Sequence, residues 1–155
     1  MTPAITSAKK AGIKFRTRRY DHDPGAQSYG EEAADKLGIP AGRIFKTLVA
    51  ALDGGEHAVG VVPVSGRLNL KALAEALGAK KSAMADEKDA ERLTGYVLGG
   101  ISPLGQRKKL KTVIDRSALN FETIFVSAGK RGLQIEISPR DLGTLTGARF
   151  AWIAI

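Results

Sequence analysis

One lysine lies in an unusual setting for a charged side chain. Lys46 belongs to the run 43–52, in which apolar residues occupy both faces of an expected strand. Such a run indicates an interior strand, where an unpaired ammonium costs several kcal/mol. Lys46 therefore needs a carboxylate partner, or it lines a pocket and meets an anionic or carbonyl group of a ligand. The alternative is a lysine near a strand end whose amine reaches water along its own stem.

Two turns could add chemical groups to such a pocket. Gly99 and Gly100 permit close approach of the backbone to a ligand and can direct N–H groups at an anion or a carbonyl, although glycine pairs are also common in ordinary turns. Ser127 begins a second turn, which carries Lys130 and Arg131. It supplies a hydroxyl beside a cationic pair suited to phosphate, or it is simply a basic hairpin tip.

Three further side chains have a chemical and a plain structural interpretation. Tyr20 and Tyr29 offer rings on which a nucleobase could stack, or they are half-buried members of the core. His22 could act as a general base, but no serine or cysteine in a recognised nucleophile pattern is nearby, so a solvated loop residue is the simpler interpretation. The sequence has no phosphate-binding glycine loop, dinucleotide fingerprint or metal-ligand motif. No metal and no cofactor are therefore expected.

The charge of the chain indicates an anionic partner. The net charge is +8, from 24 Lys and Arg against 16 Asp and Glu. The excess is densest in residues 101–155, which include the cluster Arg107, Lys108 and Lys109. Such an imbalance favours nucleic acid as the partner, although it also fits a basic protein that binds none. None of these clusters by itself encodes base readout.

Composition also bounds the class of protein. A chain of 155 residues suits one domain, residues 1–155, with a single core. It contains no cysteine, which excludes disulfides, thiolate metal sites and a cysteine nucleophile. No apolar stretch approaches the roughly 18 residues of a spanning helix, and the start of the sequence does not resemble a secretory signal. We expect no membrane partner and a cytoplasmic location.

The elements that must position these residues are mixed. Helices are expected to begin after Thr2, Ser28, Asn69 and Ser138 and at Asp86, because each position resembles a helix N-terminus, and glycines end the first three. Strands are expected over 15–20, 43–52, 57–64, a short stretch before Gly99, 113–114, 123–127, 133–137 and 148–155. Strands and short helices do not alternate strictly. The fold class is therefore α+β, with a mixed and partly barrel-like sheet flanked by short helices.

A set of motifs spread over essentially the whole chain is specific in combination. The motifs are Thr2-Pro3-Ala4, Tyr20-x-His22-Asp23-Pro24, Phe45-Lys46-Thr47-Leu48, Leu77-Gly78-Ala79-Lys80-Lys81, Met84-Ala85-Asp86, Thr94-Gly95-Tyr96, Gly99 to Gln106 and Gly129-Lys130-Arg131-Gly132-Leu133. Together they resemble the YbaK-type Cys-tRNA(Pro) deacylases, relatives of the editing insertion domain of bacterial prolyl-tRNA synthetases. The resemblance implies the fold of that family and a free-standing enzyme that hydrolyses the ester between a wrong amino acid and tRNA.

The resemblance also implies roles for individual residues. Lys46 would anchor the aminoacyl-adenosine end of the substrate, and Gly99 and Gly100 would join it in stabilising the oxyanion. The positions that would shape the substrate pocket are Tyr20, Tyr29, Thr47, Ser127, Gly129 and Gln134. The tRNA would contact Arg107, Lys108, Lys109, Lys130 and Arg131. The family typically has Phe at position 29, and a close relative carries Asp at position 134, for which Glu136 on the same strand face is a candidate substitute.

In this family the substrate is thought to supply its own nucleophile. The cysteine thiol would attack its own ester carbonyl and the amino acid would leave as a cyclic thioester, so that the enzyme needs only to orient the group and stabilise the oxyanion. The expected substrate is Cys-tRNA(Pro), with Cys-tRNA(Cys) a further candidate, and prolyl-tRNA synthetase is a candidate partner in a ternary complex. The alternatives are a deacylase for alanine on tRNA(Pro) and a non-catalytic tRNA-binding module.

Overall fold

The computed structural model describes all residues, 1–155, and contains five α-helices, one 3-10 helix and eight strands. In chain order the elements are α1 (Pro3–Lys10), β1 (Phe15–Arg19), α2 (Tyr29–Leu37), β2 (Phe45–Leu52), β3 (His57–Pro63), α3 (Leu70–Ala76), β4 (Ser82–Met84), α4 (Glu87–Thr94), β5 (Lys111–Asp115), η1 (Arg116–Asn120), β6 (Ile124–Lys130), β7 (Leu133–Ile137), α5 (Pro139–Thr146) and β8 (Arg149–Ala151). The predicted α+β class is confirmed.

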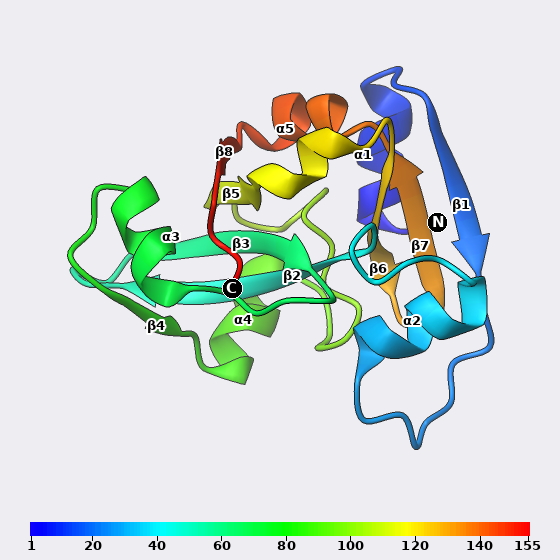
Figure 1. Ribbon diagram of the computed structural model, residues 1–155, viewed down its shortest axis with the longest axis horizontal. Helices are drawn as coiled ribbons and strands as arrows, with labels where there is room; N and C mark the ends of the chain where they lie inside the picture. Colours follow the sequence, from blue (N-terminus) through cyan, green and yellow to red (C-terminus); the bar gives the residue numbers. More distant parts are fainter.

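The strands form two separate sheets (Figure 1). The smaller has the order β1-β7-β6 and is antiparallel throughout. The larger has the order β4-β2-β3-β5-β8, in which β4, β2 and β3 are antiparallel neighbours while β5 and β8 join in parallel. The larger sheet is thus mixed, as expected. Neither sheet closes on itself, so the barrel-like element of the prediction is wrong.

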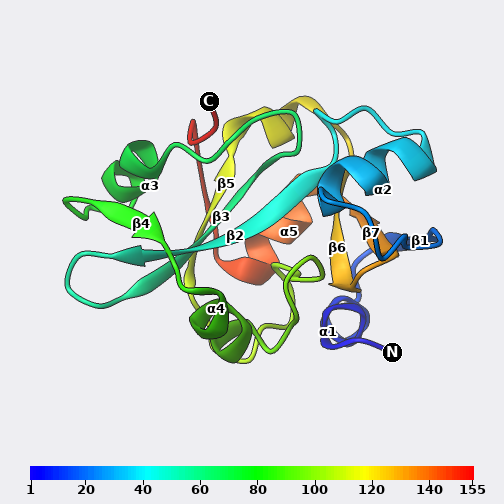
Figure 2. The ribbon, with the colours of Figure 1, turned by 90° about the horizontal axis from the view of Figure 1, so that it is seen from below.

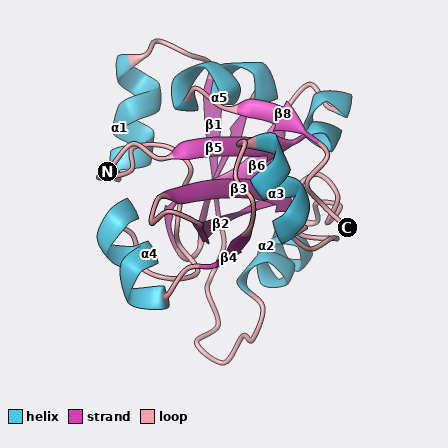
Figure 3. Ribbon diagram, turned by 90° about the vertical axis from the view of Figure 1, so that its left-hand side faces the viewer, coloured by secondary structure: helices cyan, strands magenta, loops and turns pink.

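Local sequence explains where the helices start and stop. Thr2, Ser28, Asn69 and Ser138 each accept a hydrogen bond from a backbone N–H of the first helical turn. These side chains satisfy donors that a helix N-terminus leaves free. Gly38, Gly95 and Gly147 end α2, α4 and α5 in the left-handed conformation that glycine adopts without strain. Figure 3 shows the helices arranged around the outside of the strands.

The core is divided among three clusters of apolar side chains. The largest joins α1, the inner face of β6 and β7, and one face of β2 and β3 around Ile114, Ile124 and Ile135. A second, around Leu73 and Ile153, packs α3 and the end of the chain on the opposite face of the larger sheet. A third, formed by Ile44 and Phe125 with α2, lies where the two sheets meet. Both faces of β2 are therefore covered, as its sequence predicted.

The structure corrects the expected elements in three places. No strand precedes Gly99; residues 96–98 belong to a loop. The short strand β4 and the 3-10 helix η1 were not predicted, since neither has a clear period in its sequence. The expected strand 148–155 is shortened to β8, although Ala154 forms an isolated bridge with Leu68. No helix is long and apolar enough to cross a membrane.

Candidate functional site

A pocket of about 330 Å³ opens where the two sheets separate. Ile44 and Phe125 form a parallel bridge between the start of β2 and β6. Lys46 and Ser127 each lie two residues beyond this bridge, on strands that then turn into different sheets. Ser127 is paired in register with Gln134 of β7. Three strands therefore bring one residue each to the same distance from the bridge. These residues, Lys46, Ser127 and Gln134, all line the pocket.

The pocket exists because one edge of β2 is left uncovered. The short strand β4 pairs with β2 only from Ala50 to Leu52, and β6 forms a bridge only with Ile44, the residue before β2. Between these contacts the edge carries no partner strand, and residues 45–48 line the pocket instead. The other walls are the start of α2 and the loop 98–101. Figure 2 shows this loop between α4 and the three-stranded sheet.

Lys46 is half-buried and has no ion-pair partner. None of the five ion pairs in the protein includes it. Burial lowers the pKa of its ammonium below the ordinary value; the negative charge of Glu31 opposes this and the positive charge of Arg67 adds to it. Of the predicted settings, the carboxylate partner is wrong, and Lys46 lines the pocket. It is also the second residue of β2, near a strand end, as the alternative expected. A desolvated, unpaired cation there is suited to meet an anionic or carbonyl oxygen.

Two buried polar atoms of the pocket wall also lack partners. Thr47 and Gln134 are each 8% exposed, and neither Thr47 Oγ1 nor Gln134 Oε1 forms a hydrogen bond within the protein. A buried polar atom without a partner typically costs about 1–3 kcal/mol. Ser127 adds a third group: its Oγ accepts from the Gly129 N–H at 3.1 Å, which leaves its own O–H free to donate. The pocket therefore offers hydrogen-bonding capacity that the fold does not use.

The two adjacent glycines have different roles. Gly99 lines the pocket in the left-handed region, with φ 85°, and a Cβ there would lie 2.7 Å from the Tyr29 ring. Its N–H has no acceptor in the protein. Gly100, by contrast, is outside the pocket, and its N–H donates to Val97 O at 2.9 Å. The expectation that both N–H groups face a substrate is therefore wrong for Gly100, and for Gly99 it stays a prediction.

Arg131 fastens the walls of the pocket together. Its guanidinium lies 4.6 Å from the Tyr29 ring centroid, and its Nε and Nη2 donate to Leu98 O at 2.9 and 2.6 Å. The turn after β6 is thus tied to the loop 98–101 and to the start of α2. Arg131 was predicted to bind tRNA, but its hydrogen-bonding fork is engaged inside the protein. Lys130, beside it, is exposed and makes no such contact.

Five other predicted site positions do not line the pocket. Tyr20 packs beside the cluster of Ile44 and Phe125, and burial raises the pKa of its phenol. Gly129 is in the bulge of β6, with φ 110°, where a Cβ would lie 2.8 Å from the Tyr96 ring. Its role is close packing. The remaining predicted tRNA contacts, all exposed and outside the pocket lining, are Arg107, Lys108 and Lys109.

Sequence reasoning missed a buried carboxylate next to the pocket. Glu32 of α2 is 8% exposed and accepts hydrogen bonds from His22 Nδ1 at 2.7 Å, Asp23 N at 2.6 Å and Lys36 Nζ at 3.2 Å. Burial raises its pKa, but these hydrogen bonds outweigh that effect and lower it to about 2. The expectation of a solvated His22 is therefore wrong. The i,i+4 spacing of Glu32 and Lys36 is the signal that the sequence offered.

Glu136 does not replace the carboxylate expected near Gln134. Its Oε2 accepts from Thr123 Oγ1 at 2.6 Å and from Arg43 Nη2 at 3.2 Å. These residues line a second pocket, separate from the one that contains Lys46. The pocket around Lys46 therefore carries the neutral amide of Gln134, where the resemblance implied an acid, and no carboxylate lines it. No cluster of three or more His, Cys, Asp or Glu side chains is arranged to hold a metal ion.

Comparisons with known proteins identify relatives of this chain. The aminoacyl-tRNA editing domain model matches residues 23–145. EbsC of Enterococcus faecalis, named with a proposed Cys-tRNA(Pro)/Cys-tRNA(Cys) deacylase activity, is 46% identical over 79% of this chain and 75% of its own length. The multifunctional Ser/Thr-tRNA deacylase ProXp-y of Escherichia coli is 28% identical over 88% of this chain and 82% of its own.

More distant matches extend the same pattern. A proline–tRNA ligase of Geobacter metallireducens is 33% identical over 68% of this chain, which is 18% of the ligase. The crystal structure of a proposed trans-editing enzyme for prolyl-tRNA synthetase superposes with a TM-score of 0.80 at 23% identity, covering 100% of this chain and 99% of that one. It confirms the predicted fold. The chain therefore belongs to the aminoacyl-tRNA editing domain family, which confirms the family predicted from its sequence and the enzyme class, aminoacyl-tRNA deacylation, that the family implies.

Proposed function

We propose that this protein removes cysteine from misacylated tRNA(Pro), acting in trans as a chain separate from the synthetase. The observation that carries the proposal is the unpaired, half-buried Lys46 beside the free N–H of Gly99 in one pocket. Both groups are suited to an oxygen that gains negative charge. The 46% identity to EbsC supports cysteine as the amino acid, and Cys-tRNA(Cys) is a second substrate of the same chemistry.

The proposed mechanism uses the thiol of the substrate as the nucleophile. Its sulfur bonds to the ester carbonyl carbon, the bond from that carbon to the ribose oxygen breaks, and the thiol proton passes to the ribose oxygen. The products are a cyclic thioester, which water then opens, and the free tRNA. This route suits a pocket whose lining includes no cysteine and no histidine. Lys46 favours the thiolate and the oxyanion alike, because it places a positive charge near both.

The pocket's remaining groups would hold the aminoacyl ester in a bent conformation. Thr47 Oγ1 and Gln134 Oε1 have no protein partner and would receive polar hydrogens of the substrate. The Ser127 hydroxyl is free to donate, and the Tyr29 ring lines the mouth. Orientation of this kind can contribute several kcal/mol to a reaction within one bound molecule. Gly99 is the remaining catalytic glycine of the proposal, because the Gly100 N–H is already used.

A panel of mischarged tRNAs tests the proposal. Cysteine, alanine, serine and threonine are each esterified to tRNA(Pro), with Cys-tRNA(Cys) alongside, and release is followed together with detection of the cyclic thioester. Cysteine should be released fastest and without added metal. Equal release of alanine would overturn the thiol mechanism, and faster release of serine or threonine would assign the specificity of ProXp-y instead. Binding of tRNA with no release would identify a non-catalytic tRNA-binding module.

The relation to prolyl-tRNA synthetase gives a second, finer proposal. The chain resembles a segment of a proline–tRNA ligase, and we propose that it meets its tRNA in a ternary complex with that synthetase. Sedimentation of the protein with synthetase and tRNA(Pro), each pair alone and all three together, decides the point. A complex that requires all three components supports it. Deacylation that synthetase neither accelerates nor slows, without co-sedimentation, would overturn it.

A further inference from the structure

The chain's one tryptophan is held on the surface. Trp152 is 65% exposed and follows β8, the edge strand of the larger sheet. The backbone next to it is fixed: Asp115 Oδ1 accepts from the N–H groups of Ile153 and Ala154, both at 2.9 Å, and the Ile153 side chain is fully buried. A large aromatic ring presented by a fixed backbone is a typical contact residue of an interaction site.

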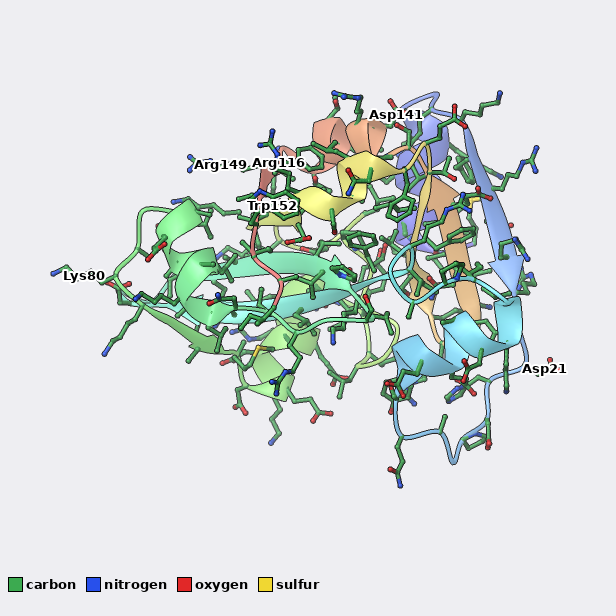
Figure 4. All side chains as sticks on the ribbon, in the orientation of Figure 1. Asp21, Lys80, Arg116, Asp141, Arg149 and Trp152 are labelled. Carbon is green, nitrogen blue, oxygen red and sulfur yellow. The ribbon has the colours of Figure 1, made fainter.

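Arginines flank the exposed ring without acidic partners. Arg116 follows Asp115, whose strand partner is Ala151, so Arg116 and Trp152 leave adjoining strands together. Figure 4 shows Arg116, Arg149 and Trp152 in the same region of the surface. Arg149 donates to Ala76 O at 2.8 Å, and neither it nor Arg116 belongs to any ion pair. An exposed ring among unpaired guanidinium groups matches a platform for single-stranded nucleic acid.

Strand register places this platform on the same row of the sheet as the pocket. Lys46 is paired with Val62 of β3. The parallel pairing of Val61 with Ile114 puts the next residue of β5 beside Val62, and Ala151 of β8 completes the row. Three strand spacings separate Lys46 from Ala151, which corresponds to about 14 Å. A single strand whose end occupies the pocket therefore needs only a few nucleotides to reach Trp152.

A further arginine lies near Lys46 and is held on the C-terminal segment that follows Trp152. Arg67 is exposed, and its backbone exchanges hydrogen bonds with Ile155, at 3.0 and 2.8 Å. Its charge is close enough to Lys46 to lower that group's pKa. It has no ion-pair partner. Lys46 belongs to the row and Arg116 follows its third member, Asp115, while Arg67 adds a positive charge near Lys46. Such cations attract a phosphate backbone.

We infer that Trp152, with Arg67 and Arg116, binds the single-stranded 3′ segment of tRNA, with a base stacked on the indole ring. The inference rests on the proposed function, since the esterified end of that segment would occupy the pocket. It assigns tRNA contacts to a surface other than the cluster at 107–109. The arginines favour RNA as the partner, because their guanidinium groups have no acidic partner in the protein and phosphate oxygens would supply the missing negative charge.

Fluorescence of Trp152 tests the inference, because no other tryptophan contributes. Uncharged tRNA is titrated against the protein, and then the same tRNA with its single-stranded 3′ end removed. Trp152→Ala should weaken binding of intact tRNA roughly 5- to 150-fold, raising KM with kcat unchanged. Arg116→Ala should weaken it less and reduce the salt dependence. Met84→Ala and Lys80→Ala are matched controls, since both residues are exposed at the opposite edge of the sheet, on or just before β4.

Each outcome decides the matter. Quenching that needs the single-stranded end, together with the weakened Trp152→Ala variant, supports the platform. Unchanged fluorescence with unchanged tRNA affinity in that variant overturns it, even if deacylation proceeds and the proposed function stands. The platform would also be overturned by a fluorescence change that depends on the concentration of this protein or of added synthetase but not on tRNA. Such a change would assign the surface to a protein partner. Quenching by tRNA without any deacylation keeps the platform and rejects the deacylase.

Discussion

Two groups of charged side chains lie close to each other near α2 and differ in one respect. In the Glu32 cluster, a buried carboxylate has three hydrogen-bond donors, His22, Asp23 and Lys36. In the pocket, the Lys46 ammonium has no ion partner, and two buried oxygens have no donor. The effects on pKa are opposite in kind: hydrogen bonds favour the charged form of Glu32, whereas burial disfavours the charged form of Lys46.

The difference distinguishes a structural site from a functional one. A polar group whose partners are all supplied by the protein contributes to stability, and a ligand gains nothing by approaching it. A desolvated group without partners costs stability and gains most when a ligand arrives. The pocket therefore contains polar groups whose hydrogen bonds and ion pairs only a ligand can supply. The Glu32 cluster instead holds the loop 21–28 against α2, whose start forms one wall of the pocket. The predictions below test this contrast.

The largest effect is expected for Lys46→Ala. Loss of the cation should reduce the rate of deacylation about 100- to 1000-fold, because no other charged residue lines the pocket. The free energy of unfolding should change by less than about 1 kcal/mol, since the ammonium has no partner to lose. Single-turnover kinetics and urea unfolding measure the two quantities. Lys80→Ala, at an exposed lysine, should alter neither, and undiminished turnover of Lys46→Ala would remove this residue from the mechanism.

Glu32→Gln is expected to lose stability and keep its activity, the reverse of Lys46→Ala. Loss of the charged acceptor should lower the free energy of unfolding by about 1–3 kcal/mol at neutral pH, while the folded enzyme stays active. The control is Asp89→Asn, which breaks the more exposed ion pair with Arg92 and should cost less than about 0.5 kcal/mol. A Glu32→Gln protein that is as stable as the wild type but inactive would move Glu32 from the structural to the catalytic side of the comparison.

The same carboxylate predicts a dependence of stability on pH. The pKa of Glu32 is about 2 in the folded protein, against an ordinary value of 4.5. A lowered pKa means that its contribution is complete above the unfolded value and is lost as the pH falls from 4.5 towards 2. Unfolding free energies measured across this window should fall less steeply in Glu32→Gln than in the wild type. Parallel curves would show that Glu32 is not the residue responsible.

The sequence predicts those features of the fold and the pocket that depend on residues close together in the chain. Side-chain caps and glycine stops are local signals, so both ends of α1, α2 and α3 and the start of α5 were predicted close to where the structure has them. Lys46 was recognised because apolar residues surround it within ten positions. The junction between the two sheets, where the pocket opens, could not be predicted. It depends on the bridge between Ile44 and Phe125 and on β4, a strand of three residues, which is too short to show an alternating hydrophobic pattern. The engagement of Arg131 and Gly100 depends on contacts that no local pattern encodes.

A smaller effect is expected for Thr47→Val, which should raise stability and lower activity. This change keeps the shape of the side chain and removes an oxygen without a partner, so it should stabilise the fold by up to about 1 kcal/mol and slow deacylation about 10-fold. Thr112→Val is the matched control, because the buried Thr112 Oγ1 donates to Leu110 O at 3.1 Å. It should lose about 1 kcal/mol of stability with no effect on activity. Loss of stability in both variants would show that Thr47 is satisfied after all.

The smallest effect is expected for Arg131→Lys, which keeps the charge and loses the fork that holds Leu98 O. One hydrogen bond of about 1 kcal/mol corresponds to roughly a 5-fold fall in kcat/KM, and this fall should be the same at low and high salt, because the lost contact joins two groups of the protein and involves no tRNA phosphate. The exposed Lys130 provides the contrast: Lys130→Ala should change activity only through a salt-dependent KM if it contacts tRNA. A salt-dependent loss in Arg131→Lys as well would return Arg131 to the tRNA-binding surface, whereas a salt-independent loss confirms it as the residue that positions Tyr29 and Gly99 across the mouth of the pocket.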